Sequence, residues 1–480
     1  MSNTATVLAF DFGASSGRAI RAVYDGQNLT YEEIHRFENV PIEKDGHLCW
    51  DVETLLKEIH TAIQKAGTFD SLGFDTWGVD FGLLDTDGHL LANPVHYRDA
   101  RTNGKPEQAA ARMPAEELYA HTGNQIMAIN TLFQLLALQE QEPELLQKAE
   151  QILFMPDLFA ALLGAEPVCE RSIASTSQML DPRTGQWSRE VLAAYGLNEK
   201  HFAPIVASGT VTGTLANGAK IIAVAGHDTQ CASAAMPCAE EDAEHTAFLS
   251  CGTWSLLGTE LDAPILDSCQ SGLSNELGAN GKINYLKNII GLWLIQESRR
   301  EYKRRGQAYS FAELEQQALA AEPLRSFIDP DAPEFVAPGD LPGRIQEFCR
   351  KTGQPIPETV GAVMRCIYES LALKYRYAIE QLSAVTGRAF TTLHVLGGGT
   401  KDRLLCQMTA DCCGLTVKAG PVEATALGNI MIQLKALGLL DSITQGRRLI
   451  AETEVIKTYT PSTHNHVSRK NAYDRFKTLL

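Results

Sequence analysis

The chain has 480 residues, of which 44% are hydrophobic and 21% are charged. This length exceeds what one hydrophobic core normally organises, so the sequence predicts two domains that are folded throughout. The 42 basic and 58 acidic side chains give a formal net charge of −16. Because this charge repels the phosphates of nucleic acids and of anionic lipids, we expect neither a nucleic acid nor a membrane as a partner.

The start of the chain, MSNTATVLAF, has no basic segment, and no apolar run approaches the roughly 20 residues of a membrane helix. We therefore expect no signal peptide, no membrane span and a cytoplasmic location. The 11 cysteines are scattered and include no C-x-x-C pair. This spacing predicts neither a zinc site nor a disulfide framework.

The first half alternates strand and helix patterns, which is typical of an α/β fold. A strand is expected at residues 7–13 and a second one before the turn signal Asp25-Gly26. Further on, the patterns predict a helix at 52–63, a glycine-interrupted strand at 71–85, helices at 132–138 and 158–163, and a buried strand at 221–225.

A charged segment without apolar periodicity, at residues 239–245, precedes a new strand-turn-strand pattern at 246–260. We therefore expect an N-terminal domain of residues 1–242 and a C-terminal domain of residues 243–480. The second half has a loop-rich stretch at 329–342, a long helix whose apolar face runs from Val360 to Ile379 and which ends by Gly387, a strand at 392–399, and a helix at about 402–412 that is capped by Gly414. Both halves open with a glycine-containing strand-turn-strand, which indicates an ancient duplication.

The segment DFGASSGR at residues 11–18 joins the first two predicted strands. Its backbone N–H groups and the hydroxyls of Ser15 and Ser16 can donate hydrogen bonds to phosphate oxygens, and the Asp11 carboxylate can hold Mg²⁺. A plain glycine-rich hairpin is the alternative, since neither Walker A nor G-x-G-x-x-G is present.

A second hairpin of the same kind, LSCGTWS at residues 249–255, places Thr253 beside a glycine. Two such hairpins can hold one polyphosphate from two domains. Three glycines at residues 397–399 end a predicted strand and precede a helix, which lets the backbone approach a flat ligand such as adenine. A structural turn is the alternative for these glycines.

The segment AGHDT at residues 225–229 ends a buried strand where a helix is expected to begin. This places Asp228 at the rim of the predicted sheet, which is where α/β folds bind ligands. The alternative is that Asp228 is only the N-cap of the helix.

These motifs, in this order and over nearly the whole chain, resemble the FGGY family of carbohydrate kinases, within the actin-like superfamily that includes hexokinase and the Hsp70 ATPase domains. Four strings are similar to the branch that acts on L-rhamnulose: DTWGVDF at 75–81, YRDART at 97–102, KNIIGLWL at 287–294 and GPVEA at 420–424. The string GHDTQ at 226–230 is also similar to the branch that acts on L-fuculose.

The resemblance implies an α/β fold of two actin-like (ribonuclease H-like) domains, each with a mixed sheet, and an active-site cleft between them. The N-terminal domain would bind the sugar and supply the catalytic base, and the C-terminal domain would bind the nucleotide. The implied reaction is ATP-dependent and Mg²⁺-dependent phosphorylation of L-rhamnulose at its 1-hydroxyl, which gives L-rhamnulose 1-phosphate and ADP; a related ketose such as L-fuculose is the alternative substrate.

The resemblance also implies roles for individual residues. Asp228 is the general base. The sugar is contacted by Gly78, His227, Asp228, Thr229 and Asn288, and the nucleotide by Ala14, Ser15, Ser16, Gly17, Arg18, Thr253, Gln296 and Gly398. Trp77 is a further candidate for the apolar side of the sugar, although an aromatic side chain in a strand is more often part of a core.

Two other classes of protein are compatible with part of this pattern. An actin-like regulator that binds ATP without phosphorylating a metabolite would keep both hairpins and the adenosine glycines. It would not need an acid such as Asp228 beside a sugar pocket, so Asp228 favours an enzyme. A redox protein has little support, because the chain has neither C-x-x-C nor a dinucleotide fingerprint.

Overall fold

The computed structural model describes residues 4–462 and 466–480, so the first three residues of the predicted N-terminal domain lie outside the described residues. The chain forms two units. Unit 1 contains Met1–Glu240, Glu260–Leu286 and Ala424–Glu454. Unit 2 contains Glu241–Thr259, Lys287–Glu423 and Val455–Leu480.

The strands are β1 (Ala5–Phe12), β2 (Ser16–Tyr24), β3 (Leu29–Glu38), β4 (Ile42–Lys44), β5 (His47–Cys49), β6 (Ser71–Thr76), β7 (Phe81–Leu84), β8 (Gln151–Phe154), β9 (Cys169–Glu170), β10 (Leu180–Asp181), β11 (Gln186–Trp187), β12 (Ile205–Val206), β13 (Thr210–Thr214), β14 (Lys220–Ala223), β15 (Thr246–Cys251), β16 (Trp254–Leu261), β17 (Ser274–Leu277), β18 (Ile283–Ile290), β19 (Thr392–Leu396), β20 (Thr416–Ala419) and β21 (Lys457–Tyr459).

The α-helices are α1 (Val52–Ala66), α2 (Lys105–Ala109), α3 (Ala115–Thr122), α4 (Thr131–Gln141), α5 (Pro143–Lys148), α6 (Met155–Leu162), α7 (Arg171–Ala174), α8 (Arg189–Tyr195), α9 (Asp228–Ala234), α10 (Trp293–Arg304), α11 (Phe311–Ala320), α12 (Leu341–Lys351), α13 (Val360–Thr386), α14 (Arg403–Cys413), α15 (Ala424–Ala436), α16 (Ile443–Thr453) and α17 (His466–Lys477). Short 3-10 helices are η1 (Ala100–Thr102), η2 (Glu199–His201), η3 (Glu240–His245), η4 (Cys269–Ser271), η5 (Pro333–Phe335) and η6 (Gly398–Lys401).

A six-stranded mixed sheet with the order β13-β14-β6-β1-β2-β3 forms the centre of unit 1. The hairpin β1–β2 and the pair β2–β3 are antiparallel, whereas β6 is parallel to both β1 and β14. The predicted turn at Asp25-Gly26 is confirmed, because it joins β2 to β3. The interrupted strand at 71–85 is also confirmed as β6 and β7, but β7 pairs with β8 outside the main sheet.

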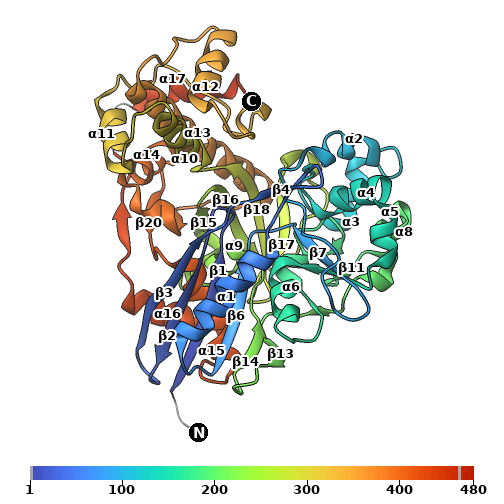
Figure 1. Cartoon of the computed structure of the whole chain (residues 1–480). Helices are drawn as coiled ribbons and strands as arrows, with labels where there is room; N and C mark the ends of the chain where they lie inside the picture. Colours follow the sequence, from blue (N-terminus) through green and yellow to red (C-terminus); the bar gives the residue numbers. More distant parts are fainter. Residues whose placement is uncertain (1–3, 463–465) are drawn as a thin grey trace. The chain divides into compact units, whose positions relative to one another are not determined.

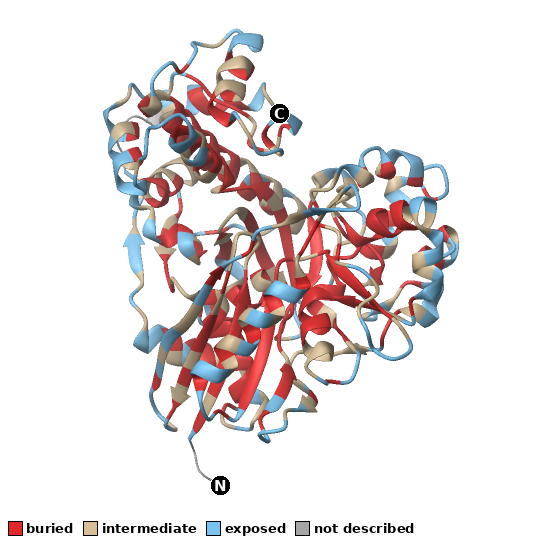
Figure 2. Ribbon diagram, viewed as in Figure 1, coloured by how far each residue is buried: buried red, intermediate tan, exposed pale blue. Residues whose placement is uncertain are grey.

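Aromatic side chains of neighbouring strands form the core around β1 and β6. The ring of Phe10 stacks on Phe74 at 4.8 Å, and the ring of Phe12 stacks on Phe159 of α6 at 4.9 Å. Helix α15 packs against β1 and β6, α6 packs against β6, and α1 packs against β2 and β3 (Figure 1). Buried residues therefore follow the strands, while the outward faces of the helices carry the exposed ones (Figure 2).

A second mixed sheet has the order β17-β18-β16-β15-β19-β20-β21. Its hairpin β15–β16 is antiparallel, β19 is parallel to β15 and to β20, and the edge strand β21 is antiparallel to β20. The strands β2, β1, β6, β14 and β13 have this same order and these same directions in the first sheet. This repeated topology supports the predicted duplication, and the α/β class with two mixed sheets is confirmed.

The helix α15 comes late in the sequence but belongs to unit 1, where it packs against β1, β6 and α9. Its Asn429 Nδ2 donates a hydrogen bond to Asp75 Oδ2 at 2.7 Å, and its Gln433 Nε2 donates to the Leu8 carbonyl at 3.1 Å. At Gly428 a Cβ atom would lie 1.9 Å from the Cys231 carbonyl oxygen, so only glycine permits this close approach.

The predicted domain division at 242/243 stays a prediction. The first transition between the units, at Glu240–Glu241, lies close to it, but unit 1 also contains Glu260–Leu286 and Ala424–Glu454. The long helix expected between Val360 and Gly387 is α13, and Gly387 is its C-cap with a φ of 70°. Within the described residues, no helix is both long and apolar enough to cross a membrane.

Candidate active site

Three neighbouring parallel segments of unit 1 end at one edge of the sheet. In the register of β1 and β6, Asp11 is opposite Asp75. Beyond the end of β14, His227 forms a parallel bridge with Thr76, and the Thr76 N–H donates to the Gly226 carbonyl at 2.8 Å. The carboxyl ends of parallel strands are where α/β folds bind ligands. The structure therefore brings the predicted metal ligand and the predicted base to the same sheet edge.

Asp228 is the first residue of α9, whose N-cap is His227. The alternative interpretation of Asp228 as a helix N-cap is therefore wrong. Its Oδ1 accepts hydrogen bonds from the Thr229 N–H at 2.6 Å and the Thr229 hydroxyl at 3.3 Å, and lies 3.5 Å from His227 Nε2. The described contacts of this carboxylate are all at Oδ1, and 31% of the side chain is exposed.

The charge state of Asp228 depends on its surroundings. Burial raises the pKa of Asp228 to about 6, the nearby His227 opposes this rise, and the Asp11 carboxylate adds to it. A carboxylate with such a pKa is ionised at pH 7 and still a better proton acceptor than an exposed aspartate. This environment suits a general base.

Asp11 is paired with an arginine, whereas the neighbouring Asp75 has a buried oxygen without a partner. The Arg18 guanidinium donates to Asp11 Oδ2 from Nε at 3.0 Å and from Nη2 at 2.7 Å. Asp75 is fully buried, and its Oδ1 has no hydrogen-bond partner. Burial and then the Asp11 carboxylate raise the pKa of Asp75 well above its usual range.

The first glycine-rich segment is the β1–β2 turn, closed by a hydrogen bond from the Gly13 N–H to the Ser16 carbonyl at 2.9 Å. Ala14 and Ser15 lie in the turn itself, and Ser16 begins β2. A Cβ atom at Gly17 would lie 2.2 Å from the Phe37 ring, so Gly17 also has a packing reason to be glycine. A substitution of Gly17 would therefore disturb the packing against Phe37, and the predicted phosphate contact of Gly17 stays a prediction.

Backbone strain marks the segment beside Gly78. Val79 has a φ of 68°, which is unusual for a β-branched residue. Its N–H donates to the Thr176 hydroxyl at 3.1 Å and its carbonyl accepts from the Thr131 hydroxyl at 2.6 Å, so two neighbours hold the strained peptide. Such strain persists only where the surroundings hold the backbone in place, and the predicted role of Gly78 stays a prediction.

Trp77 is only 5% exposed and packs on Trp50 at 4.1 Å between ring centroids. Both indole N–H groups donate to Asp80 Oδ2, at 2.9 and 2.7 Å, and the Gln134 amide and the Tyr97 N–H also donate to Asp80. Asp80 is thus occupied by four protein donors. The predicted contact of Trp77 with a sugar stays a prediction, and its low exposure leaves little of the residue for such a contact.

The remaining predicted residues lie in unit 2. The hairpin turn between β15 and β16 contains Thr253, whose hydroxyl donates to Gln296 Oε1 of α10 at 3.4 Å. Gly398 begins η6, and a Cβ atom there would meet no atom within 4 Å. Asn288 lies in β18, in the part of that strand assigned to unit 2. Nothing in unit 2 contradicts the predicted nucleotide contacts, which stay predictions.

Two buried carboxylates near Asp228 carry no motif and were missed at the sequence level. Glu276 of β17 accepts hydrogen bonds at Oε2 from His227 Nδ1 and Gln230 Nε2, both at 2.7 Å. Glu170 accepts at Oε2 from the Gly226 N–H at 2.9 Å and the Ser172 hydroxyl at 2.5 Å. In the sequence, each of these two glutamates is a single acid in a short segment without a motif. Such a pattern is too common to indicate a functional site.

Glu170 fixes the peptide that precedes His227. Its Oε2 also accepts from the N–H groups of Ser172 and Ile173, at 2.8 and 3.2 Å, and its Oε1 accepts from the Ser208 hydroxyl at 2.5 Å. The carboxylate therefore ties the start of α7 and the loop before β13 to the segment that ends in Asp228. A Cβ atom at Gly226 would lie 2.9 Å from Pro156 Cγ, so this segment has little freedom to move.

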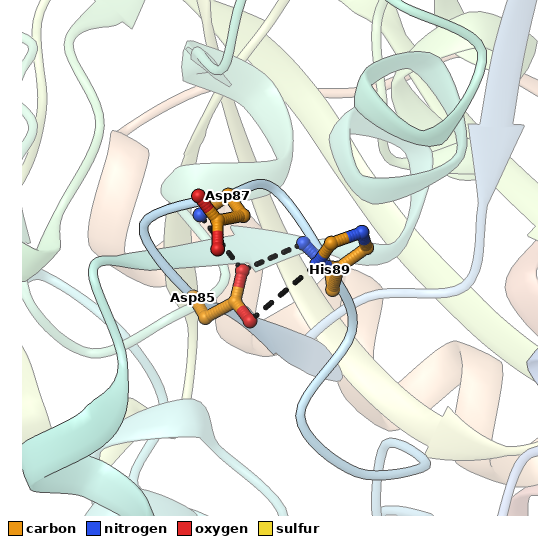
Figure 3. Close-up of side chains that lie close together, drawn as sticks. All are labelled: Asp85, Asp87 and His89. Carbon is orange, nitrogen blue, oxygen red and sulfur yellow. Dashed lines mark hydrogen bonds and ion pairs between the residues drawn. The ribbon is translucent and has the colours of Figure 1, made fainter.

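One cluster with metal-ligating side chains lies elsewhere. Asp85, Asp87 and His89 have ligand atoms within 4.8 Å of one another, which is the single such group of three in the described part of the chain (Figure 3). Asp85 Oδ1 accepts from the N–H groups of Asp87 and His89, at 2.9 and 2.8 Å. These hydrogen bonds close the turn after β7, so turn formation explains the cluster.

The sequence matches the N-terminal domain of the FGGY family of carbohydrate kinases over residues 6–234 and the C-terminal domain of that family over residues 247–437. The chain belongs to the FGGY family of carbohydrate kinases. It is therefore an enzyme of the class that phosphorylates sugars, and its substrates are a sugar and ATP. The sequence resemblance to this family is confirmed.

Curated relatives match the chain over almost its full length. A rhamnulokinase of Bacteroides thetaiotaomicron is 43% identical, with 98% of this chain and 99% of that protein covered. A rhamnulokinase of Enterococcus faecalis is 40% identical, with 98% and 97% covered. A rhamnulokinase of Enterobacter sp. is 39% identical, with 98% of each covered.

Solved structures show the same fold at low sequence identity. A gluconate kinase from Lactobacillus acidophilus has a TM-score of 0.79 at 16% identity, with 99% of this chain and 97% of that chain covered. A structure titled as a xyloylose kinase from Brucella ovis has a TM-score of 0.78 at 20% identity, with 99% and 98% covered. At these identities the likeness establishes the fold alone.

We predict that Glu170→Ala loosens the segment before Asp228. Its removal leaves the buried Gly226 N–H without an acceptor, and a lost buried hydrogen bond of about 1–3 kcal/mol corresponds to roughly 10- to 100-fold faster amide exchange. Hydrogen–deuterium exchange of peptides that span residues 223–228 measures this change. Ser208→Ala is the matched control, since it removes one donor to Oε1 and leaves Gly226 bonded; equal exchange at Gly226 in wild type and Glu170→Ala would contradict the prediction.

Proposed function

We propose that this protein transfers the γ-phosphoryl group of ATP to the 1-hydroxyl of L-rhamnulose, which gives L-rhamnulose 1-phosphate and ADP. The observation that carries the choice of sugar is the 39–43% identity to curated rhamnulokinases over 98% of the chain. The structure supports the chemistry through the position of Asp228 at the edge of the sheet. A cytoplasmic location, where ATP is available, is part of this proposal.

Asp228 acts as the general base. Phosphoryl transfer has a loose transition state, so catalysis consists mainly of positioning and charge stabilisation, and a weak base suffices. The sugar O1 forms a bond to the γ-phosphorus while the bond from that phosphorus to the bridging oxygen of ADP breaks. The O1 proton passes to the Asp228 carboxylate, whose Oδ1 is already held by Thr229 and faces His227.

The polar groups around Asp228 would bind the sugar. We place His227 and Thr229 at its hydroxyl-rich end, with Gly78 beside the strained peptide of Val79. Asn288 of unit 2 is assigned to the same ligand. Since Asp80 is saturated by internal donors, it holds Trp50 and Trp77 in place and does not bind a hydroxyl itself.

Residues 14–18 and Thr253, Gln296 and Gly398 would contact the nucleotide. The β1–β2 turn presents Ala14 and the Ser15 hydroxyl, and Arg18 compensates the charge of Asp11. Backbone N–H groups in such turns are suited to phosphate oxygens.

The site also fits Mg²⁺. Asp11 and Asp75 are register partners, and Asp75 Oδ1 is a buried carboxylate oxygen without a hydrogen-bond partner. Mg²⁺ is held by one or two carboxylates together with waters and phosphates, so Asp11, with Asp75 behind it, would hold the ion. Bound there, the ion would stabilise negative charge on the transferred phosphoryl group.

We predict that Asp228→Asn lowers kcat by roughly 10²- to 10⁴-fold, because the amide keeps the size of the side chain but cannot accept the proton. ADP release coupled to a dehydrogenase assay measures kcat, and calorimetry with ATP checks that nucleotide binding is unchanged. Turnover near the wild-type rate would remove Asp228 from the mechanism.

The pH dependence of kcat/KM follows from the raised pKa of Asp228. The base must be ionised, so activity falls as pH drops below the pKa of about 6 and is constant above it. We expect log kcat/KM for the ketose to increase with pH up to about 6 and then level off. A profile that is flat from pH 5 to 8 would show that this group does not act as the base.

The choice of sugar is tested with L-rhamnulose, L-fuculose, L-ribulose, L-xylulose and glycerol in the same assay. We expect the highest kcat/KM for L-rhamnulose and weaker activity with the five-carbon ketoses, since a missing methyl group costs only about 1–3 kcal/mol. L-Fuculose differs in hydroxyl configuration, which misaligns polar contacts, so its kcat/KM should be lower still. A kcat/KM for L-fuculose equal to or above that for L-rhamnulose would contradict the assignment of L-rhamnulose as the substrate, but not the assignment of the protein as a sugar kinase.

A further inference from the structure

Glu276 connects a buried strand directly to the residue that precedes the base. Its side chain is 4% exposed and that of His227 is 8% exposed. Glu276 Oε2 lies 2.7 Å from His227 Nδ1 and also accepts from Gln230 Nε2 at 2.7 Å. Gln230 is oriented in turn by Asn284, which donates to its Oε1. His227 thus meets a carboxylate whose own position is determined by further hydrogen bonds.

The strand that carries Glu276 is anchored on both sides of it. The Leu277 N–H donates to the Ser175 hydroxyl at 3.0 Å, and the Asn275 N–H donates to the Gly123 carbonyl at 2.8 Å. The Asn275 side chain also bonds to the Gly123 carbonyl at 3.0 Å. These bonds, two of them from backbone N–H groups, anchor β17 on both sides of Glu276 and so hold its carboxylate beside the imidazole ring.

The bond at Nδ1 determines what the other ring nitrogen faces. A carboxylate acceptor requires a proton on Nδ1, and a histidine held in this way presents Nε2 on the opposite side of the ring. Nε2 lies 3.5 Å from Asp228 Oδ1. With Thr229 also on Oδ1, the Asp228 carboxylate is held from one side, and Oδ2 is left for a ligand.

We propose that Glu276 is a positioning residue for the phosphoryl transfer: it holds His227 by Nδ1 and so aims Nε2 at Asp228 Oδ1, which leaves Oδ2 to receive the proton of the sugar hydroxyl. This inference rests on the proposed function, because it assigns Asp228 as the base. It adds a residue of β17 to the machinery and specifies which oxygen of the base reacts.

The charges around the ring agree with this assignment. Burial lowers the pKa of His227, but Glu276, Asp228 and Glu170 raise it more, so the net pKa lies above the usual value. The imidazolium form then carries protons on both ring nitrogens and faces a carboxylate at each. The Asp11 carboxylate raises the pKa of Asp228 by charge repulsion. A positively charged His227 ring opposite Asp228 Oδ1 offsets this repulsion.

The test compares Glu276→Ala and Glu276→Gln with the wild-type protein. Alanine releases the ring, and we expect kcat to fall by about 10²-fold while the KM for ATP changes by less than about twofold. Glutamine retains an acceptor oxygen for Nδ1 and therefore should restore kcat to within about 10-fold of wild type. The matched control is Asn275→Ala, which removes a side-chain hydrogen bond to the Gly123 carbonyl but keeps the backbone anchors of β17 at residues 275 and 277 and the acceptor of His227. For this variant we expect a lower melting temperature with kcat nearly unchanged.

A second measurement needs no substrate. Long-range ¹H–¹⁵N spectra of the ¹⁵N-labelled protein report the protonation of the His227 ring, with the His227→Gln variant used to assign the signals. We expect a protonated Nδ1 in the wild type and in Glu276→Gln, and loss of this state in Glu276→Ala.

Three results would overturn the proposal: an unprotonated Nδ1 in the wild type, wild-type kcat in Glu276→Ala, or an equal loss of kcat in Asn275→Ala. Failure of the proposed function is recognised separately, because the wild-type protein would then phosphorylate no ketose whatever the state of the ring.

Discussion

Three aspartates lie close together at one edge of the first sheet, and the structure of unit 1 must offset the repulsion between them. Parallel pairing brings Asp11 and Asp75 into register, and Asp228 lies close enough for Asp11 to raise its pKa. Each acid has a different neighbour that reduces the repulsion: Arg18 for Asp11, the Asn429 amide for Asp75 and His227 for Asp228. Of these, Arg18 comes from the adjacent strand, whereas Asn429 comes from a helix more than 350 residues later in the chain. The return of the chain to unit 1 in α15 is therefore part of the construction of the site.

The same topology serves a different chemistry in the second sheet. The strand β15 corresponds to β1 and ends at Cys251, and β19 corresponds to β6 and leads into Gly397. Where the first sheet carries Asp11 and Asp75 at the ends of β1 and β6, the second carries a thiol and glycines at the ends of β15 and β19. A Cβ atom at Gly399 would lie 2.2 Å from Cys251 Sγ, so this backbone packs directly against the end of β15. The uncharged ends of β15 and β19 suit a nucleotide, and the acidic ends of β1 and β6 suit a cation, which is the division that the proposed function requires. The position after the corresponding strands β14 and β20 is acidic in both sheets, since Glu423 follows β20 as Asp228 follows β14.

The sequence predicted the elements whose signals are local. The β1–β2 hairpin, the interrupted strand at 71–85 and the Gly387 cap of α13 depend on patterns a few residues long, and each is found where it was expected. Glu170 and Glu276 could not be predicted, because each lies in a short strand without a motif and acquires its partner, Gly226 or His227, across about 50 residues of chain. Hydrophobic periodicity also does not indicate which strand a segment will pair with. The pairing of β7 with β8, outside the main sheet, was therefore not predicted.

The buried carboxylates of unit 1 divide into two groups by how fully their oxygens are satisfied. Asp80 accepts four hydrogen bonds and Glu170 accepts five, all from uncharged protein donors, so neither has capacity left for a ligand. These two acids have a structural role, since a buried carboxylate is tolerated only when its oxygens accept hydrogen bonds. Asp75 Oδ1 has no partner, and the described contacts of Asp228 involve Oδ1 alone. Because leaving a buried acceptor unpaired is costly, Asp75 Oδ1 identifies where a bound cation would complete the structure, whereas the partly exposed Asp228 offers Oδ2 to a substrate.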